Sequence, residues 1–130
     1  MWSRPVMRSL AIALSAFMLL GGPSAFAAEQ KADAVAELVI KQRGLAGKNT
    51  FRVTKGQIVE LRWSTDETVE LHLHGYDVLA KAKPGAPAVM RFKAHATGRY
   101  PVTVHVFGNK HSHRGGHSEK TILYLEVYPK

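Results

Sequence analysis

Cysteine is absent from all 130 residues of the chain. Without thiols the chain has no disulfides, no iron–sulfur or zinc–thiolate sites and no thiol nucleophile. Methionine is also scarce, because Met90 is the only one beyond residue 27. The fold must therefore be held together by packing and hydrogen bonds, and a metal site would have to use histidine nitrogens, with or without a carboxylate oxygen.

The motifs of common enzyme classes are missing as well. The sequence contains no Gly-x-Ser-x-Gly elbow, no phosphate-binding glycine loop and no His-Glu-x-x-His motif. We therefore expect a binding protein and not an enzyme. The least favoured alternative is a metal-dependent enzyme in which His72, His74 and His105 leave one metal position open to water.

Acidic residues are outnumbered by basic ones. Arg4 and Arg8 belong to the N-terminal segment that is discussed in the next paragraph. Without them the chain has 16 basic and 10 acidic residues, a net charge of +6 with histidine neutral. The basic residues are scattered and are not interleaved with exposed aromatic residues, so we do not expect nucleic acid as a partner. A solvated basic surface is the simplest interpretation. An acidic periplasmic protein or the anionic cell envelope is the partner class that this charge suits.

Long hydrophobic runs are confined to the start of the chain. Arg4 and Arg8 precede an apolar run of eleven residues, 10–20, and Ala25-Phe26-Ala27 has the small-x-small pattern of a cleavage site. The run is well short of the about 20 residues that span a bilayer. We therefore predict a signal peptide over residues 1–27, export to the periplasm or secretion, and no transmembrane segment in the mature chain.

Apolar and polar residues alternate in the rest of the chain. In the run 58–64, for example, Val59, Leu61 and Trp63 face one way, and we expect Trp63 in the core. Gly44 and Gly47 bracket an expected loop. Similar runs recur about every ten residues, at 35–43, 50–53, 58–64, 69–74, 76–82, 89–94, 100–107 and 121–128. We predict an all-β Greek-key sandwich or barrel of about seven or eight strands over residues 35–130, after a flexible N-terminus at 28–34.

Two histidines lie two residues apart in the alternating run Val69–His74. Because successive side chains of a strand point to opposite faces, His72 and His74 share one face with Glu70. Two imidazoles at this spacing, roughly 6–7 Å apart along the strand, can bind one metal ion. The alternative is an exposed polar face that happens to contain histidine.

A second group of histidines lies near the end of the chain. Four of them fall within the thirteen positions 105–117, namely His105, His111, His113 and His117. A short histidine-rich tract indicates metal binding, since neutral imidazole ligates copper, zinc and nickel. A glycine-rich loop that merely tolerates histidine is the alternative. The remaining histidine, His95, is expected to be an exposed residue in a turn.

The order of short motifs from Val53 onward resembles a cupredoxin-like domain and covers most of the mature chain. The histidine strand is followed by a histidine loop and a final strand, and the flanking motifs are Val53-Thr54-Lys55-Gly56, Lys83-Pro84-Gly85, Phe92-Lys93-Ala94, Gly98-Arg99-Tyr100 and Val127-Tyr128-Pro129. The stretch Leu71–Gly75 also resembles the His-x-His-Gly motif of multicopper oxidases, although the chain is too short for their several domains.

The cupredoxin resemblance implies a particular arrangement of the histidines. In that fold the histidine strand and the loop before the last strand lie at one pole. His72 or His74 would then approach His105 and His111, and His113 or His117 would lie nearby, whereas His95 would lie near the opposite pole. The cysteine of the type 1 copper site falls at Val104, so the resemblance implies no type 1 electron transfer.

Together these patterns favour a small exported protein that binds copper, with zinc as the alternative, for metal handling in the periplasm. Glu70, Asp77 and Glu119 are candidate carboxylate ligands or partners of the ring N–H groups. The main alternative is a metal-free interaction or structural module, because loss of the cysteine is expected in a cupredoxin-like domain that no longer works with copper.

Overall fold

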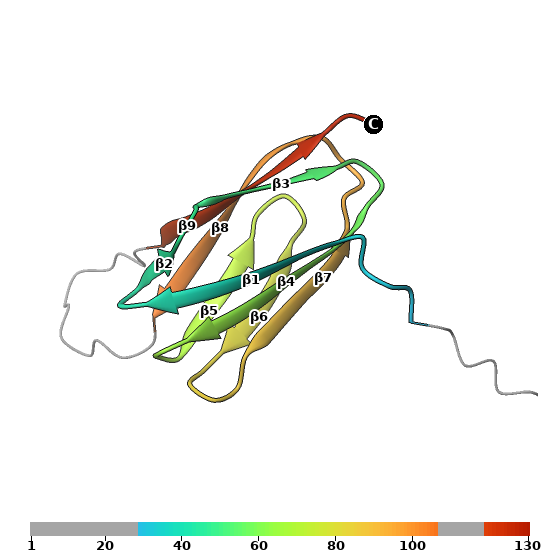
Figure 1. Ribbon diagram of the computed structural model, residues 1–130. Helices are drawn as coiled ribbons and strands as arrows, with labels where there is room; N and C mark the ends of the chain where they lie inside the picture. The colour runs from blue at the N-terminus through green and yellow to red at the C-terminus, as the bar shows by residue number, and fades with distance from the viewer. Residues whose placement is uncertain (1–28, 107–118) are drawn as a thin grey trace, which may run out of the picture.

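The computed structural model describes residues 29–106 and 119–130. Within these two ranges the chain forms nine β-strands and no helix, arranged as two facing sheets (Figure 1). Accordingly, the described residues contain no helix that is long and apolar enough to cross a membrane. The predicted signal peptide at 1–27 and three predicted ligands lie outside the described residues, namely His111, His113 and His117.

The smaller sheet has the strand order β2-β1-β4-β7. Strand β1 runs parallel to β4, and the other two pairings are antiparallel. The backbone of Asp33 anchors the start of β1, because its N–H donates to the carbonyl oxygen of Ile58 at 2.8 Å. The strands of this sheet are β1 (Ala34–Lys41), β2 (Gly44–Ala46), β4 (Ile58–Thr65) and β7 (Ala88–Lys93).

The larger sheet has the order β3-β9-β8-β5-β6. Strands β3 and β9 run parallel, and the remaining pairs are antiparallel. Its strands are β3 (Thr50–Thr54), β5 (Val69–Leu73), β6 (Val78–Ala82), β8 (Gly98–Val106) and β9 (Lys120–Tyr128). The all-β sandwich is confirmed. The strand that was not predicted is β2, which occupies the expected loop after Gly44.

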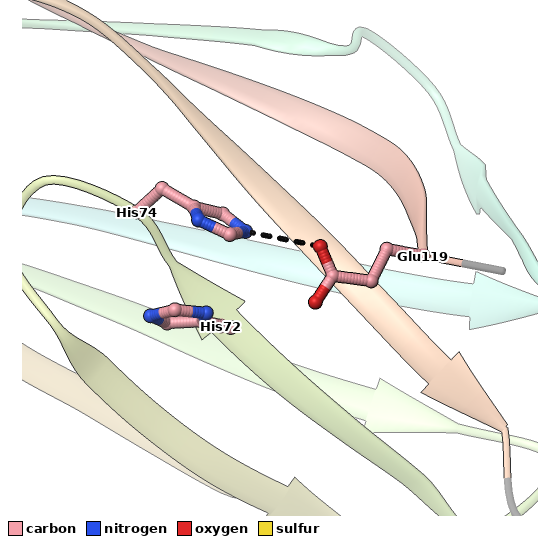
Figure 2. Close-up of side chains that lie close together, drawn as sticks. All are labelled: His72, His74 and Glu119. Carbon is pink, nitrogen blue, oxygen red and sulfur yellow. Dashed lines mark ion pairs between the residues drawn. The ribbon is translucent and has the colours of Figure 1, made fainter. Parts of the chain in front are cut away.

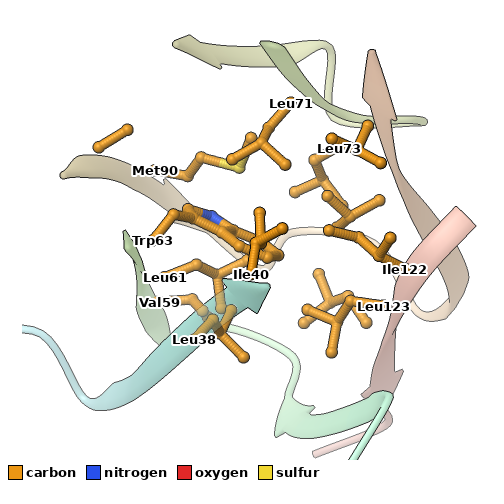
Figure 3. Packing of buried hydrophobic residues seen from close by; sticks show 14 of the residues in the cluster. Leu38, Ile40, Val59, Leu61, Trp63, Leu71, Leu73, Met90, Ile122 and Leu123 are labelled. Atoms are coloured by element: carbon orange, nitrogen blue, oxygen red, sulfur yellow. The ribbon is translucent and has the colours of Figure 1, made fainter. Parts of the chain in front are cut away.

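The core lies between the two sheets (Figure 3). Trp63 is fully buried, as predicted, and shares the core with Met90 from its own sheet and with Leu71 and Leu123 from the other. Burial of each such side chain is worth about 1.5–3 kcal/mol. Successive side chains of a regular strand point to opposite faces, so the residues between the core residues lie on the outer faces of the sheets.

Charged side chains form a ladder on the outer face of the smaller sheet. Glu60 accepts hydrogen bonds from Arg62 at 2.6 Å and from Arg91 at 2.8 Å, and Arg62 also donates to Glu37 at 2.9 Å. These strands are neighbours, so the ladder joins β1, β4 and β7 across the sheet. The hydrogen bond from Arg62 is the main reason that the pKa of Glu60 lies below its ordinary value, against the opposing effect of burial.

The lowered pKa of Glu60 predicts a pH-dependent contribution to stability. A carboxyl group whose pKa is lower in the folded state stabilises the fold above its unfolded pKa, and the contribution is lost as the pH falls through the folded value. Glu60→Gln should therefore lower the urea midpoint at about pH 7, and the difference from wild type should shrink toward about pH 3. Glu29→Gln, at an exposed position, is the control. A difference that stays constant over this range would contradict the prediction.

Candidate metal centre

Strand β5 places its apolar residues in the core and its histidine on the outer face of the larger sheet. Leu71 and Leu73 are fully buried. His72 and His74, which directly follows the strand, keep 25% and 35% of their side chains exposed. Their ring centroids are 4.0 Å apart, so the two imidazoles lie against each other above the sheet.

The register between β5 and β8 adds two side chains to this face. Thr103 pairs with His72, and His105 pairs with Glu70. Among the described residues, Thr103 is the one polar residue that is buried. Its hydroxyl lies 2.9 Å from Nε2 of His74. This contact fixes the orientation of the His74 ring.

A β-bulge in β9 brings a carboxylate to the same face. Val102 pairs with Leu123 and Thr103 with Thr121, so Ile122 is an extra residue on the β9 side. Ile122 and Leu123 are both buried, which breaks the alternation. A regular strand would turn every second residue before Leu123 toward the core, and Glu119 is one of these. The bulge reverses this direction and turns Glu119 toward the histidines.

Glu119 connects the histidines of the two strands. Its Oε1 lies 2.7 Å from Nε2 of His105, and its Oε2 lies 3.6 Å from Nε2 of His74. Figure 2 shows Glu119 reaching toward His74, with His72 alongside. On the other side, Oδ1 of the exposed Asp77 lies 3.6 Å from Nε2 of His72. The result is a group of imidazoles and carboxylates that is open to solvent on one side.

Three of these residues are arranged closely enough for a metal ion. One ligand atom from each of His72, His74 and Glu119 lies within 4.8 Å of the others. With bonds of about 2.0–2.2 Å, ligand atoms around one ion lie roughly 3–4 Å apart, so a small side-chain rotation closes the group. Two imidazole nitrogens and one carboxylate oxygen suit Cu(II) or Zn(II). The residues present therefore fit such an ion.

The predicted ligands are only partly brought together. The rings of His72 and His74 lie together, and His105 contacts Glu119, which lies beside His74. Glu119 was one of three candidate carboxylates, and the alternation gave no reason to prefer it. The adjacent apolar residues Ile122 and Leu123 in an otherwise alternating run are the sequence signal that indicates the bulge.

The placement of the histidines along the sandwich differs from the one that the cupredoxin resemblance implied. Strands β5 and β8 are antiparallel, so the N–H of His74 donates to Pro101 near the start of β8, at 3.0 Å. The chain leaves the described part of β8 after Val106, which pairs with Val69 at the opposite end of β5. The His95 ring lies 4.8 Å from that of Tyr76, near the turn after β5 and not at the far pole. His95 is exposed, as predicted.

Val104 explains why a type 1 copper site cannot form around this pair. Its side chain is only 2% exposed and it pairs with Leu71, so it points into the core. His72 and His74 lie on the opposite face of the same sheet. A thiolate at position 104 would therefore face away from these histidines.

An aromatic cluster supports the turn that follows His74. Gly75 has φ = 82°, and a Cβ there would lie 2.5 Å from a Tyr100 ring carbon. The rings of Tyr100 and Tyr76 pack edge to face at 4.8 Å, and the Tyr76 hydroxyl donates to the carbonyl oxygen of Ala96 at 2.8 Å. Burial raises the pKa of Tyr76 above its ordinary value. The turn thus needs a glycine at position 75.

Gly75→Ala is predicted to destabilise the protein and displace His74. The left-handed backbone costs roughly 1–2 kcal/mol for a residue with a Cβ, and the clash with Tyr100 adds about 1–3 kcal/mol. Gly85→Ala is the matched control, because Gly85 has φ = 75° and a Cβ added there would meet no neighbouring atom within 4 Å. Urea unfolding measures the loss in the free energy of unfolding of each variant. Equal losses in the two would show that Tyr100 does not restrain the turn.

No family model matches the chain, and no curated protein matches it. Several solved structures have a similar fold. The periplasmic domain of subunit II of cytochrome oxidase from Bradyrhizobium japonicum aligns with a TM-score of 0.56 and 17% identity, over 78% of this chain and 88% of that one. A copper binding protein in its apo form aligns with a TM-score of 0.53 and 10% identity, over 76% and 92%.

A chain of a heme-copper terminal oxidase dimer also aligns, with a TM-score of 0.55 and 23% identity over 73% of this chain. The present chain spans 65% of the length of that oxidase chain. At these identities the likeness establishes the fold. The fold is therefore cupredoxin-like, as the sequence resemblance implied.

Proposed function

We propose that this chain is a small copper-handling protein that binds one copper ion through His72, His74 and Glu119. The observation that carries the proposal is the convergence of three ligand atoms within 4.8 Å on one sheet face. A copper binding protein among the structures of similar fold supports copper as the metal. The role would be storage, delivery or sensing.

The donor set favours copper over zinc. A site of nitrogen and oxygen donors binds Cu(II) more tightly than Zn(II) by the Irving–Williams order. A bound copper ion would supply a Lewis-acidic centre without the thiolate bond on which type 1 electron transfer depends. Thr103 would orient the ring of His74, and His105 would hold the carboxylate of Glu119.

Export to the periplasm is part of this proposal. It rests on the predicted signal peptide at residues 1–27. It is supported by the similar fold of a periplasmic domain of cytochrome oxidase subunit II.

A metal-free module is the second candidate, and one observation favours it. The polar groups of the site already satisfy one another, because Thr103 contacts His74 at 2.9 Å and Glu119 contacts His105 at 2.7 Å. A metal-dependent enzyme is the weakest candidate. Its support is that three protein ligands would leave a metal position open.

Titration calorimetry with Cu(II) distinguishes these candidates. We expect one copper ion per chain with a Kd below about 1 μM, and a loss of at least about tenfold in affinity for His72→Ala, His74→Ala and Glu119→Gln. His95→Ala is the matched control, because His95 is an exposed histidine outside the three-residue group, and its affinity should be unchanged.

Other outcomes would contradict the proposal in distinct ways. Binding that survives the substitutions of His72 and His74 but is lost on deletion of residues 109–117 would assign the metal to that segment. Absence of binding at neutral pH would leave the metal-free module. Tighter binding of Zn(II) than of Cu(II) would reverse the choice of metal. Metal-dependent turnover that is lost with the same histidines would indicate the enzyme.

A further inference from the structure

A recess opens at the end of the sandwich where the β3–β4 turn, the β7–β8 loop and the end of β9 meet. Its volume is about 700 Å³. In Figure 1 these three segments come together near the end marked C. The side chains that define the chemistry of this basic recess are Lys55, Lys93, His95, Thr97 and Lys130.

Backbone hydrogen bonds hold the walls of the basic recess together. The N–H of Lys55 donates to Tyr128 and that of Gly56 donates to Ala94, both at 2.8 Å. Ala94 in turn donates to Gln57 at 2.9 Å. The three segments are therefore fixed relative to one another, and the lysines are brought together by the fold and not by side-chain attraction.

Acidic side chains do not balance the charge of the basic recess. Of the described residues that line it, three are lysines and none is Asp or Glu. Among the described residues, no ion pair was found for Lys55, Lys93 or Lys130. The acidic side chains in the ion pairs of the described residues are not among those that line the recess. Gathered like charges repel one another, so this end of the protein favours a multiply charged anion.

We propose that the basic recess is the docking site for a carboxylate-rich segment of a partner protein. Each lysine ammonium offers three hydrogen-bond donors without a fixed geometry, which suits several carboxylates on a flexible segment. Complementary charge of this kind raises the association rate and selects the partner. The proposal does not depend on copper binding.

A membrane surface fits these observations less well. The lysines surround one recess of about 700 Å³, which gives several carboxylates of one peptide a shared place to bind. The large exposed apolar residues also give this end little to insert into a bilayer. Among the described residues, Tyr128 is the one large exposed apolar residue next to the recess, and the others lie on β1, β6 and β7, namely Val35, Val39, Leu79 and Val89.

The basic recess is close to the turn that carries His74. His95 lines the recess, and its ring lies 4.8 Å from that of Tyr76, two residues after His74. The Tyr76 hydroxyl bonds Ala96 in the β7–β8 loop. A partner docked in the recess would therefore lie beside the turn that leads to the metal centre.

An NMR titration of the metal-free purified protein with an octaglutamate peptide tests the proposal. At low ionic strength we expect saturable shifts of the amides at 55–57 and 93–97. The double variant Lys55→Glu/Lys93→Glu should bind at least about tenfold more weakly. Lys41→Glu/Lys48→Glu changes the net charge equally at exposed positions outside the recess, and it should bind within about twofold of wild type.

Three results would overturn the proposal. Equal weakening in both double variants would show that net charge alone attracts the peptide. Absence of saturable shifts would show that the recess has no affinity for carboxylates. Binding of phosphatidylglycerol vesicles that requires Lys55 and Lys93, without peptide binding, would assign the surface to lipid. If the first double variant fails to fold, Lys55→Gln/Lys93→Gln replaces it, with Lys41→Gln/Lys48→Gln as its control.

Discussion

The two pairings of β8 are the constraint on which the candidate metal centre depends. Pairing with β5 sets Thr103 opposite His72, and the bulged pairing with β9 sets Thr103 opposite Thr121. A shift of one residue in either pairing would turn one set of donors into the core. The ligands come from strands that are distant in sequence, so strand register positions them before any metal is present.

The same alternation serves the core and the site. Leu71 and Leu73 are fully buried, so their hydrophobic burial fixes the face on which His72 and His74 must lie. Val104 lies on the core side of β8 for the same reason. The cupredoxin-like fold is thus retained here with its histidines on an outer sheet face, where the thiolate position of the type 1 site is out of reach.

Much of the fold follows from short-range patterns in the sequence. Alternation located most strands and the buried Trp63, because a half-buried strand imposes a period of two. It did not predict β2, whose three residues are too few to show a period. The position of Glu119 was not predictable from alternation either, because the bulge at Ile122 is a property of the pairing between β8 and β9. The expectation that His95 lies at the opposite pole from His72 and His74 came from the cupredoxin resemblance. In the structure the His95 ring lies beside Tyr76, near the turn that follows His74.

Copper anomalous diffraction from a crystal of the protein grown with Cu(II) would locate the metal. We expect one copper peak within about 2.0–2.2 Å of a ring nitrogen of His72, a ring nitrogen of His74 and a carboxylate oxygen of Glu119. Copper held only by His111, His113 or His117, with His72 and His74 left uncoordinated, would contradict it.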